Sequence, residues 1–199
     1  MQAIPLGPQN LQFPTPIAIA PRIYRDHRGY FYESFNEQEF KEKVADIDFV
    51  QDNQSKSAYG VLRGMHFQKP PYEQAKLVRV IKGAVLDIVI DIRQDSPTFG
   101  HYYTQFLSEY NHRQLFVPRG FAHGFVSLAD DTLFQYKCDN YYNKDSEGSI
   151  LATDPDMNLP WTSFVNSDDI IMSDKDLLAP RFLHLFGVDA SMVENEKGD

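Results

Sequence analysis

The chain has 199 residues, 42% of them hydrophobic and 14% aromatic, which is enough for one globular domain with a filled core over residues 1–199. Its formal net charge of -9 disfavours nucleic acid and anionic membrane surfaces, so neither is expected as a partner. The single cysteine, Cys138, excludes an internal disulfide, and the first residues lack a signal-peptide pattern, which favours the cytoplasm. Apolar runs such as Val85 to Ile90 fall far short of a membrane span.

The first part of the chain, residues 1–24, is punctuated by prolines. This pattern predicts an extended N-terminal arm rather than a helix, and arms of this kind often pack on a neighbouring subunit. Asn36 followed by Glu39 is a capping signature at the start of a helically spaced stretch. It predicts one short helix over residues 37–44.

Between residues 49 and 142, strand-forming segments alternate with turn sequences at regular spacing. This spacing predicts a mainly β protein, a jelly-roll sandwich or barrel with a few short helices. In the segment from Val85 to Asp91, one parity is apolar while the other includes Asp87, so the two strand faces are expected to differ. Residues 181–199 form a C-terminal tail of unknown role, and its polar end is expected to be disordered.

Two of the six histidines, His66 and His123, stand in patterns that suggest chemistry. His66 lies three residues after Arg63 and ten before Lys76, and facing strands of a barrel could bring all three into one cavity. A core histidine flanked by two cations with buried stems is an equally good interpretation. The other four histidines have the contexts of ordinary surface imidazoles: His27, His101, His112 and His184.

His123 closes the motif Pro118-Arg119-Gly120-Phe121-Ala122-His123, whose spacing resembles the second signature of the cupin superfamily. Metal-binding cupins add a His-x-His pair and a glutamate in their first signature. Here Gln68 takes the place of the second imidazole, and Glu73 is the only carboxylate downstream in that loop. The sequence therefore favours a cupin that binds no metal, with a metal-dependent isomerase or dioxygenase as an alternative.

Three further residues are ambiguous when taken alone. Tyr136 alternates with Phe134 and could donate a proton or simply pack, because a tyrosine is an acid only where neighbours adjust its pKa. Tyr142 could stack on a nucleotide base or pack. Asp176 ends the run Ser173-Asp174-Lys175-Asp176, which is typical of a solvated turn or helix start.

Ordered blocks along most of the chain resemble the dTDP-4-dehydrorhamnose 3,5-epimerase family, the cupin enzymes of the dTDP-L-rhamnose pathway. The blocks are Arg25-Asp26-His27-Arg28-Gly29-Tyr30-Phe31-Tyr32-Glu33-Ser34-Phe35, Phe49-Val50-Gln51-Asp52-Asn53, Asp91-Ile92-Arg93, Ser96-Pro97-Thr98-Phe99-Gly100, Gln114-Leu115-Phe116-Val117-Pro118, Tyr136-Lys137 and Ser173-Asp174-Lys175-Asp176. The chain departs from the family at Ala75, where Gly is frequent, and in residues 150–153, which lack the frequent Trp-Asn.

The resemblance implies a role for each matching residue. His66 corresponds to the catalytic base, Asp176 to the carboxylate that orients it, Tyr136 to the acid and Lys76 to the cation at the substrate's C4 oxygen. The positions implied to bind substrate are Arg28, Phe31, Glu33, Gln51, Asn53, Arg63, His123, Tyr142, Glu147 and Lys175. The segment 28–33 is expected to reach in from the partner subunit of a homodimer.

The chemistry of a dTDP-4-keto-6-deoxyhexose agrees with these roles. The C4 ketone acidifies the hydrogens at C3 and C5, because loss of either gives an enolate on the C4 oxygen. A base, a cation at that oxygen and an acid on the opposite face invert a centre without metal or organic cofactor.

Other functions remain open at the level of the sequence. Relatives of this fold epimerise only C3 or move the ketone between C3 and C4, and Tyr136 favours the double epimerisation. A nonenzymatic cupin that binds a sugar nucleotide would need no base opposite an acid.

Overall fold

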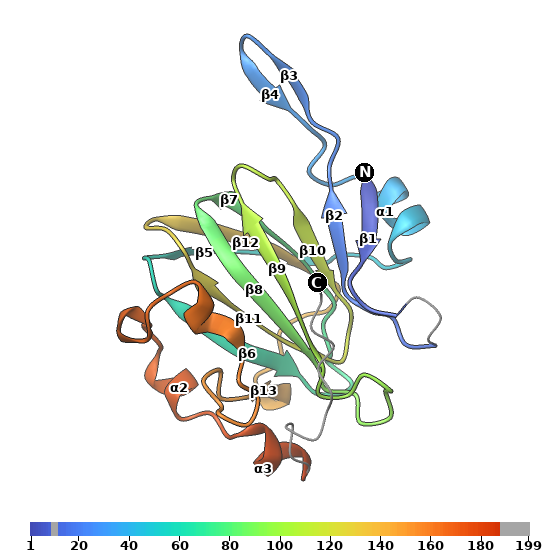
Figure 1. Ribbon diagram of the computed structural model, residues 1–199. Helices are drawn as coiled ribbons and strands as arrows, with labels where there is room; N and C mark the ends of the chain where they lie inside the picture. Colours follow the sequence, from blue (N-terminus) through green and yellow to red (C-terminus); the bar gives the residue numbers. More distant parts are fainter. Residues whose placement is uncertain (9–11, 188–199) are drawn as a thin grey trace.

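Two antiparallel sheets form the body of the computed structural model, which describes residues 1–8 and 12–187 (Figure 1). In spatial order the first sheet contains β1 (Gln2–Pro5), β2 (Ile17–Ala20), β10 (Gln114–Val117), β7 (Lys76–Lys82), β12 (Thr132–Cys138) and β5 (Gln51–Ser57). The second contains β13 (Glu147–Ser149), β6 (Leu62–Gln68), β11 (Phe121–Ser127), β8 (Ala84–Asp91) and β9 (Tyr102–Ser108). This sandwich confirms the predicted mainly β, cupin-type jelly roll.

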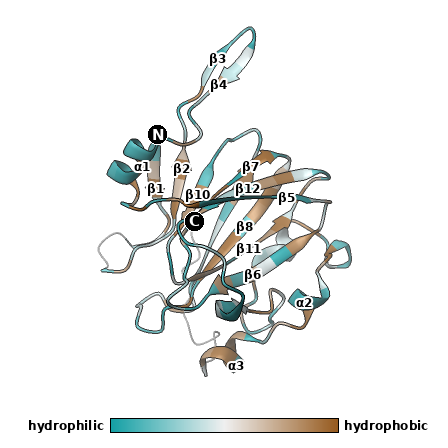
Figure 2. Ribbon diagram, turned by 180° about the vertical axis from the view of Figure 1, so that it is seen from behind, coloured by the Kyte–Doolittle hydropathy of each residue, from teal (hydrophilic) through white to brown (hydrophobic). Residues whose placement is uncertain are grey.

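Strand β8 lies in the middle of the apolar core, where Figure 2 shows hydrophobic residues along β8 and β11. Its residues 86, 88 and 90 pack beneath the C-terminal segment with Trp161 and Phe182, whereas Val85 and Val89 face the first sheet. Both faces of the strand are therefore covered. The predicted difference between its faces is not one of solvent exposure, since Asp87 is fully buried.

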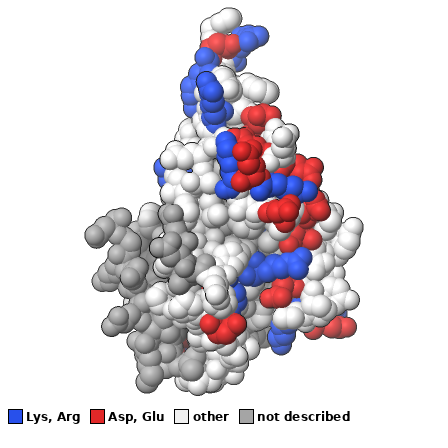
Figure 3. Space-filling view, turned by 90° about the vertical axis from the view of Figure 1, so that its right-hand side faces the viewer, with Lys and Arg blue, Asp and Glu red and all other residues white. Residues whose placement is uncertain are grey.

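Short helices close the edges of the sandwich. The first, α1 (Glu37–Lys43), begins at Asn36, whose side chain accepts a hydrogen bond of 3.0 Å from the Glu39 amide, as the capping signature predicts. Its exposed face carries ion pairs such as Lys43 with Glu39, and Figure 3 shows acidic and basic side chains intermingled on this side of the molecule. The remaining helices are η1 (Lys144–Ser146), η2 (Pro160–Ser163), η3 (Ser167–Asp169), α2 (Asp174–Leu177) and α3 (Phe182–Phe186).

A hairpin of β3 (Tyr24–Asp26) and β4 (Gly29–Phe31) projects from the body of the molecule (Figure 1). It follows strands β1 and β2, which extend the chain's own six-stranded sheet through β10. Phe31 on the hairpin is 67% exposed. The described part of the chain contains no helix with the length and hydropathy of a membrane span.

Candidate active site

A cavity of about 520 Å³ lies between the sheets, bordered by β6, β7, β11, β12 and α2. Seven of the predicted site residues line it: Arg63, His66, Lys76, His123, Tyr136, Lys175 and Asp176. The strand order explains why residues so far apart in sequence meet. Strands β6 and β11 are neighbours in one sheet, while β7 and β12 are neighbours in the sheet that faces it.

The two predicted imidazoles stand opposite each other in the ladder of β6 and β11, beside a point where the two backbones approach closely. His66 pairs with His123 in the ladder, and the register shifts between His123 and Phe125. At this point Gly64 has a φ of 135°, and a Cβ built on it would lie 2.6 Å from the Cα of Gly124. Only glycine allows this contact, so the backbone itself sets where the histidines enter the cavity.

His66 and Asp176 form a hydrogen-bonded pair, with 2.6 Å between Nε2 and Oδ1. Asp176 is buried, and its backbone amide donates to the Oγ of Ser173, the N-cap of α2. Burial lowers the pKa of His66, although the carboxylate acts in the opposite direction. The imidazole is therefore neutral at neutral pH, with one nitrogen held and the other able to accept a proton.

A second histidine and carboxylate pair joins His123, which lines the cavity, to the buried Asp87. His123 Nε2 is 3.0 and 2.9 Å from the two carboxylate oxygens of Asp87, which is 0% exposed. Burial raises the pKa of Asp87, while the charges of His123 and Lys76 lower it. Asp87 was not among the predicted site residues, and its only signal in the sequence is an acid inside an otherwise apolar strand.

Lys76 and Tyr136 enter from the opposite sheet, with the Lys76 Nζ 5.9 Å from the centre of the tyrosine ring. Burial lowers the pKa of Lys76, although Cys138, Asp87 and Glu147 act in the opposite direction. Burial also raises the pKa of Tyr136, so the phenol carries its proton at neutral pH. The cavity thus combines a neutral base with a protonated acid.

Polar side chains continue from this cavity at two places, around Arg63 on β6 and along strand β5. Arg63 is fixed by hydrogen bonds of 3.1 Å from Nε to the Ser57 Oγ and 3.3 Å from Nη2 to the Lys56 carbonyl. On β5, Gln51 donates a bond of 2.9 Å to Asn53. These two amides alternate with the outward residues of β5, as does the cavity residue Ser55.

Tyr142, Glu147 and Lys175 form a chain of contacts beside α2. The Tyr142 hydroxyl donates to Glu147 at 3.2 Å, and the Lys175 Nζ lies 2.7 Å from the other carboxylate oxygen. The hydrogen bond from Lys175 lowers the pKa of Glu147. Because Lys175 also lines the cavity, this series of contacts connects the cavity to the exposed Tyr142.

The remaining three predicted residues do not line the cavity of their own chain. Arg28 and Phe31 lie on the projecting hairpin, where the Arg28 guanidinium pairs with Asp26 at 2.6 Å (Figure 1). Glu33 follows the hairpin and accepts a bond of 3.2 Å from Asn36. All three are exposed, so they are available to a surface other than this cavity.

Gln68 has a structural role next to the site. Its amide nitrogen donates to the carbonyls of Tyr72 at 2.6 Å and Tyr141 at 3.2 Å, and its oxygen accepts from the Asn143 amide at 2.7 Å. The amide thereby holds two loops together. Within residues 1–8 and 12–187, no group of three or more His, Cys, Asp and Glu side chains is arranged to hold a metal ion.

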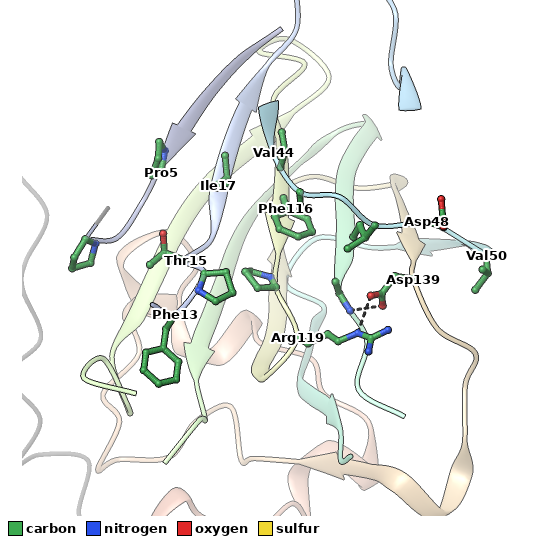
Figure 4. Close-up of a pocket in the computed structure, with 16 residues that line it drawn as sticks. Pro5, Phe13, Thr15, Ile17, Val44, Asp48, Val50, Phe116, Arg119 and Asp139 are labelled. Carbon is green, nitrogen blue, oxygen red and sulfur yellow. Dashed lines mark hydrogen bonds and ion pairs between the residues drawn. The ribbon is translucent and has the colours of Figure 1, made fainter. Parts of the chain in front are cut away.

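A larger groove of about 870 Å³ lies outside the sandwich, between the arm strands and the segment after α1 (Figure 4). Its lining is mainly proline, aliphatic and aromatic, including Phe13 and Phe116. Its cation, Arg119, is already paired with Asp139 at 2.8 Å. None of the predicted site residues lines this groove, and its apolar walls suit a charged sugar nucleotide poorly, so the smaller cavity is the candidate active site.

A jelly roll whose cavity sets a carboxylate-held histidine near a protonated tyrosine and a lysine defines a cupin-type enzyme for proton transfer. A family model described as dTDP-4-dehydrorhamnose 3,5-epimerase matches residues 10–184. The chain therefore belongs to the dTDP-4-dehydrorhamnose 3,5-epimerase family, as the sequence blocks predict.

Individual relatives agree with this membership over nearly the whole chain. The dTDP-4-dehydrorhamnose 3,5-epimerase of Shigella flexneri is 45% identical over 86% of this chain and 93% of its own length. The crystal structure of the enzyme from Elizabethkingia anophelis has 46% identity and a TM-score of 0.83, covering 94% of this chain and 98% of that one. The enzyme from Legionella pneumophila, solved with dTDP-4-keto-L-rhamnose, has 40% identity and a TM-score of 0.81 over 99% of each chain.

Proposed function

We propose that this protein converts dTDP-4-dehydro-6-deoxy-D-glucose to dTDP-4-dehydro-L-rhamnose by inverting C3 and C5. The observation that carries the proposal is the pairing of a neutral base, His66 held by Asp176, with a protonated acid, Tyr136, in one cavity. Lys76 lines the same cavity and is the residue placed to supply the positive charge that an enolate on the C4 oxygen requires.

Each inversion is a balanced pair of proton transfers. The free ring nitrogen of His66 takes the proton from C3 or C5, and the C–H electron pair moves into the C4 carbonyl to give an enolate. Lys76 stabilises the oxygen while Tyr136 delivers its proton to the opposite face of the carbon. The tyrosinate regains a proton from solvent, and the imidazolium releases one. A positioned base contributes a rate factor of about 10² to 10⁴.

The second pair, His123 and Asp87, holds another imidazole in a fixed position at the cavity wall. The buried carboxylate holds the His123 ring by both oxygens and also acts on the charge of Lys76. An imidazole fixed in this way offers its other nitrogen to a sugar oxygen at a constant position. We assign His123 to substrate binding and Asp87 to the positioning of His123.

The nucleotide part of the substrate would follow the polar side chains that lead out of the cavity. Arg63 and Lys175 suit the diphosphate, because both present cations at the cavity wall. The exposed ring of Tyr142 suits stacking on the base, with Glu147 holding its hydroxyl. Amide groups of Gln51 and Asn53 offer further hydrogen bonds.

We also propose that the protein works as a homodimer in the cytoplasm. Arg28, Phe31 and Glu33 belong to the binding residues by resemblance, yet they lie on and after a hairpin directed away from their own chain's body. A partner's cavity is the place where these residues would serve. The cytoplasmic location is supported by the single buried cysteine, which suits a reducing compartment.

Deuterium incorporation tests the reaction directly. In deuterated water, the wild-type protein should introduce label at both C3 and C5 of dTDP-4-dehydro-6-deoxy-D-glucose, read by proton NMR. Label at C3 alone would identify a single epimerase, and no label would contradict enzymatic proton transfer. A His66→Ala protein should introduce no label, whereas retained turnover would remove His66 as the base. Chelator treatment followed by the same assay separates a metal-dependent alternative.

A further inference from the structure

His112, in the turn between β9 and β10, has a backbone conformation that is uncommon for any residue with a side chain. Its φ is 53°, in the left-handed region that glycine and asparagine occupy at the least cost. Its side chain is buried, with 5% exposed, so the expectation of an ordinary surface imidazole is wrong for this residue. Histidine is one of the residues more often found in this region, so the burial of its ring is the observation that points to a use for the side chain.

The ring of His112 contacts two tyrosines from the hairpin segment. Its centroid lies 4.6 Å from that of Tyr30 and 5.1 Å from that of Tyr32, and the two tyrosine rings lie 5.9 Å apart. Arg25, on the other hairpin strand, lies 5.6 Å from the centre of the Tyr30 ring. The imidazole is thus the contribution of the protein body to a cluster of three rings at the hairpin.

The end of the same turn also makes a hydrogen bond to the segment that follows the hairpin. Gln114, the first residue of β10, donates a side-chain hydrogen bond of 2.7 Å to the Ser34 carbonyl. The hairpin strands themselves are exposed at every residue. Within its own chain, the projecting hairpin is directed mainly by the contacts at its base, so a small rotation there changes how its tip is presented to a partner's cavity.

We propose that His112 is a positioning residue, whose ring fixes the direction of the β3–β4 hairpin and thereby sets the affinity for substrate. The link to affinity rests on the proposed function, in which Arg28 and Phe31 contact the sugar nucleotide in the partner's cavity. Fixing the hairpin before binding avoids the entropy loss of ordering it in the complex.

Two substitutions of His112 distinguish a role of its ring from a role of its backbone in the turn. His112→Gly relieves the left-handed backbone and retains the backbone hydrogen bond to the Ser108 carbonyl, but it removes the ring. His112→Phe keeps a flat ring but makes the left-handed backbone somewhat less favourable. If the residue only formed the turn, the Gly variant would hold the hairpin at least as well as the wild type. The ring of the Phe variant would then give it no advantage over the Gly variant.

The experiment measures hydrogen exchange of the hairpin amides in residues 24–32, together with kcat and KM for dTDP-4-dehydro-6-deoxy-D-glucose. In His112→Gly we expect the hairpin amides to exchange about tenfold faster and KM to rise about tenfold, because two aromatic contacts are lost. The value of kcat should change by less than about twofold, since the His66 cavity is untouched. His112→Phe should remain close to wild type in both measurements.

Hydrogen exchange decides the positioning role independently of the substrate. Unchanged hairpin exchange in His112→Gly would overturn the proposal, and so would faster exchange with an unchanged KM. If the wild type turned over no substrate, the proposed function would fail, while the exchange contrast between Gly and Phe would still decide whether the ring holds the hairpin. His184→Ala, an exposed histidine on α3, is the matched control and should change neither measurement.

Discussion

At the scale of single residues, the cavity contains two histidine and carboxylate pairs that act on different neighbours. Asp176 raises the pKa of His66 against the effect of burial, whereas Asp87 raises that of Lys76. The active form in the proposed reaction has His66 neutral and Lys76 charged. Activity should therefore be lost as pH falls through the pKa of His66 and again as pH rises through that of Lys76.

These two carboxylates should control opposite sides of the pH profile of kcat/KM. Burial puts the acid limb below the ordinary histidine value of 6.5, and Asp176→Asn should move it lower still because a charge that favours the imidazolium is lost. We also expect kcat of Asp176→Asn to fall by about 10² to 10⁴, since the amide no longer stabilises the imidazolium.

Asp87→Asn provides the matched comparison. It should leave the acid limb in place and move the alkaline limb to lower pH, because the pKa of Lys76 falls further without the carboxylate. The alkaline limb belongs to Lys76 rather than Tyr136, whose pKa is raised by burial. Profiles in which Asp87→Asn shifts the acid limb and Asp176→Asn does not would reverse the two assignments.

The sequence identified these residues unequally. His66 and His123 carried signals of their own, through flanking cations and through the cupin spacing. Asp176 is 110 positions away from His66, and its run predicted only a turn or helix start, so family resemblance alone connected them. Asp87 and His112 were missed because their partners come from other strands and from the hairpin, which local patterns do not report.

At the scale of elements, the turn after β8 is held by one buried carboxylate. Asp91 accepts hydrogen bonds from Arg93 at 2.8 and 2.7 Å, from Ser96 at 2.7 Å and from Thr98 at 2.7 Å. Burial alone would raise the pKa of Asp91, but these donors outweigh it and the pKa is lowered. Arg93 also donates to the carbonyl of Pro14, so the same network attaches the N-terminal arm.

Asp91→Asn should therefore destabilise the fold by about 3 to 5 kcal/mol, because Arg93 loses its charged partner in a buried setting. Urea unfolding followed by fluorescence measures the change. Because the folded pKa is depressed, the stabilisation is present above the unfolded value of 3.8 and is lost as pH falls through the folded pKa. Asp95→Asn, exposed in the same turn, is the control and should stay within about 0.5 kcal/mol. Equal effects of the two substitutions would contradict a special role for Asp91.

Local patterns predicted the elements well but not their pairing. Alternation and turn residues placed the strands from β5 to β12, and the Asn36 cap placed α1 to within a residue. The association of β1 and β2 with β10 joins residues nearly 100 positions apart, for which the sequence has no local signal. The predicted disorder of residues 194–199 lies outside the described residues.

At the scale of the whole molecule, the predicted site residues include two groups that one chain does not bring together. His66 and its neighbours line the cavity, whereas Arg28 and Phe31 project on the hairpin. In a symmetric dimer the two hairpins would be exchanged, and each active site would combine side chains from both subunits. A dimer that combines two different variant chains can therefore test the contributions of the two groups separately.

Two defective homodimers should restore each other when their chains are exchanged. His66→Ala removes the base and Arg28→Ala removes a hairpin contact, so each homodimer has two defective sites. In a mixed dimer, one site combines the intact cavity of the Arg28→Ala chain with the intact hairpin of the His66→Ala chain. Random mixing makes half of the dimers mixed, so about a quarter of all sites should become fully active.

Co-refolding of the two variants followed by the epimerisation assay measures this recovery. If each hairpin served the cavity of its own chain, the mixture would show only the average of the two variants, because every cavity would keep its own defect. As a control, Asp176→Asn mixed with His66→Ala should show no recovery, since both substitutions damage the same cavity and no exchange of hairpins repairs it. Recovery in that control would contradict the assignment of both residues to one chain's site.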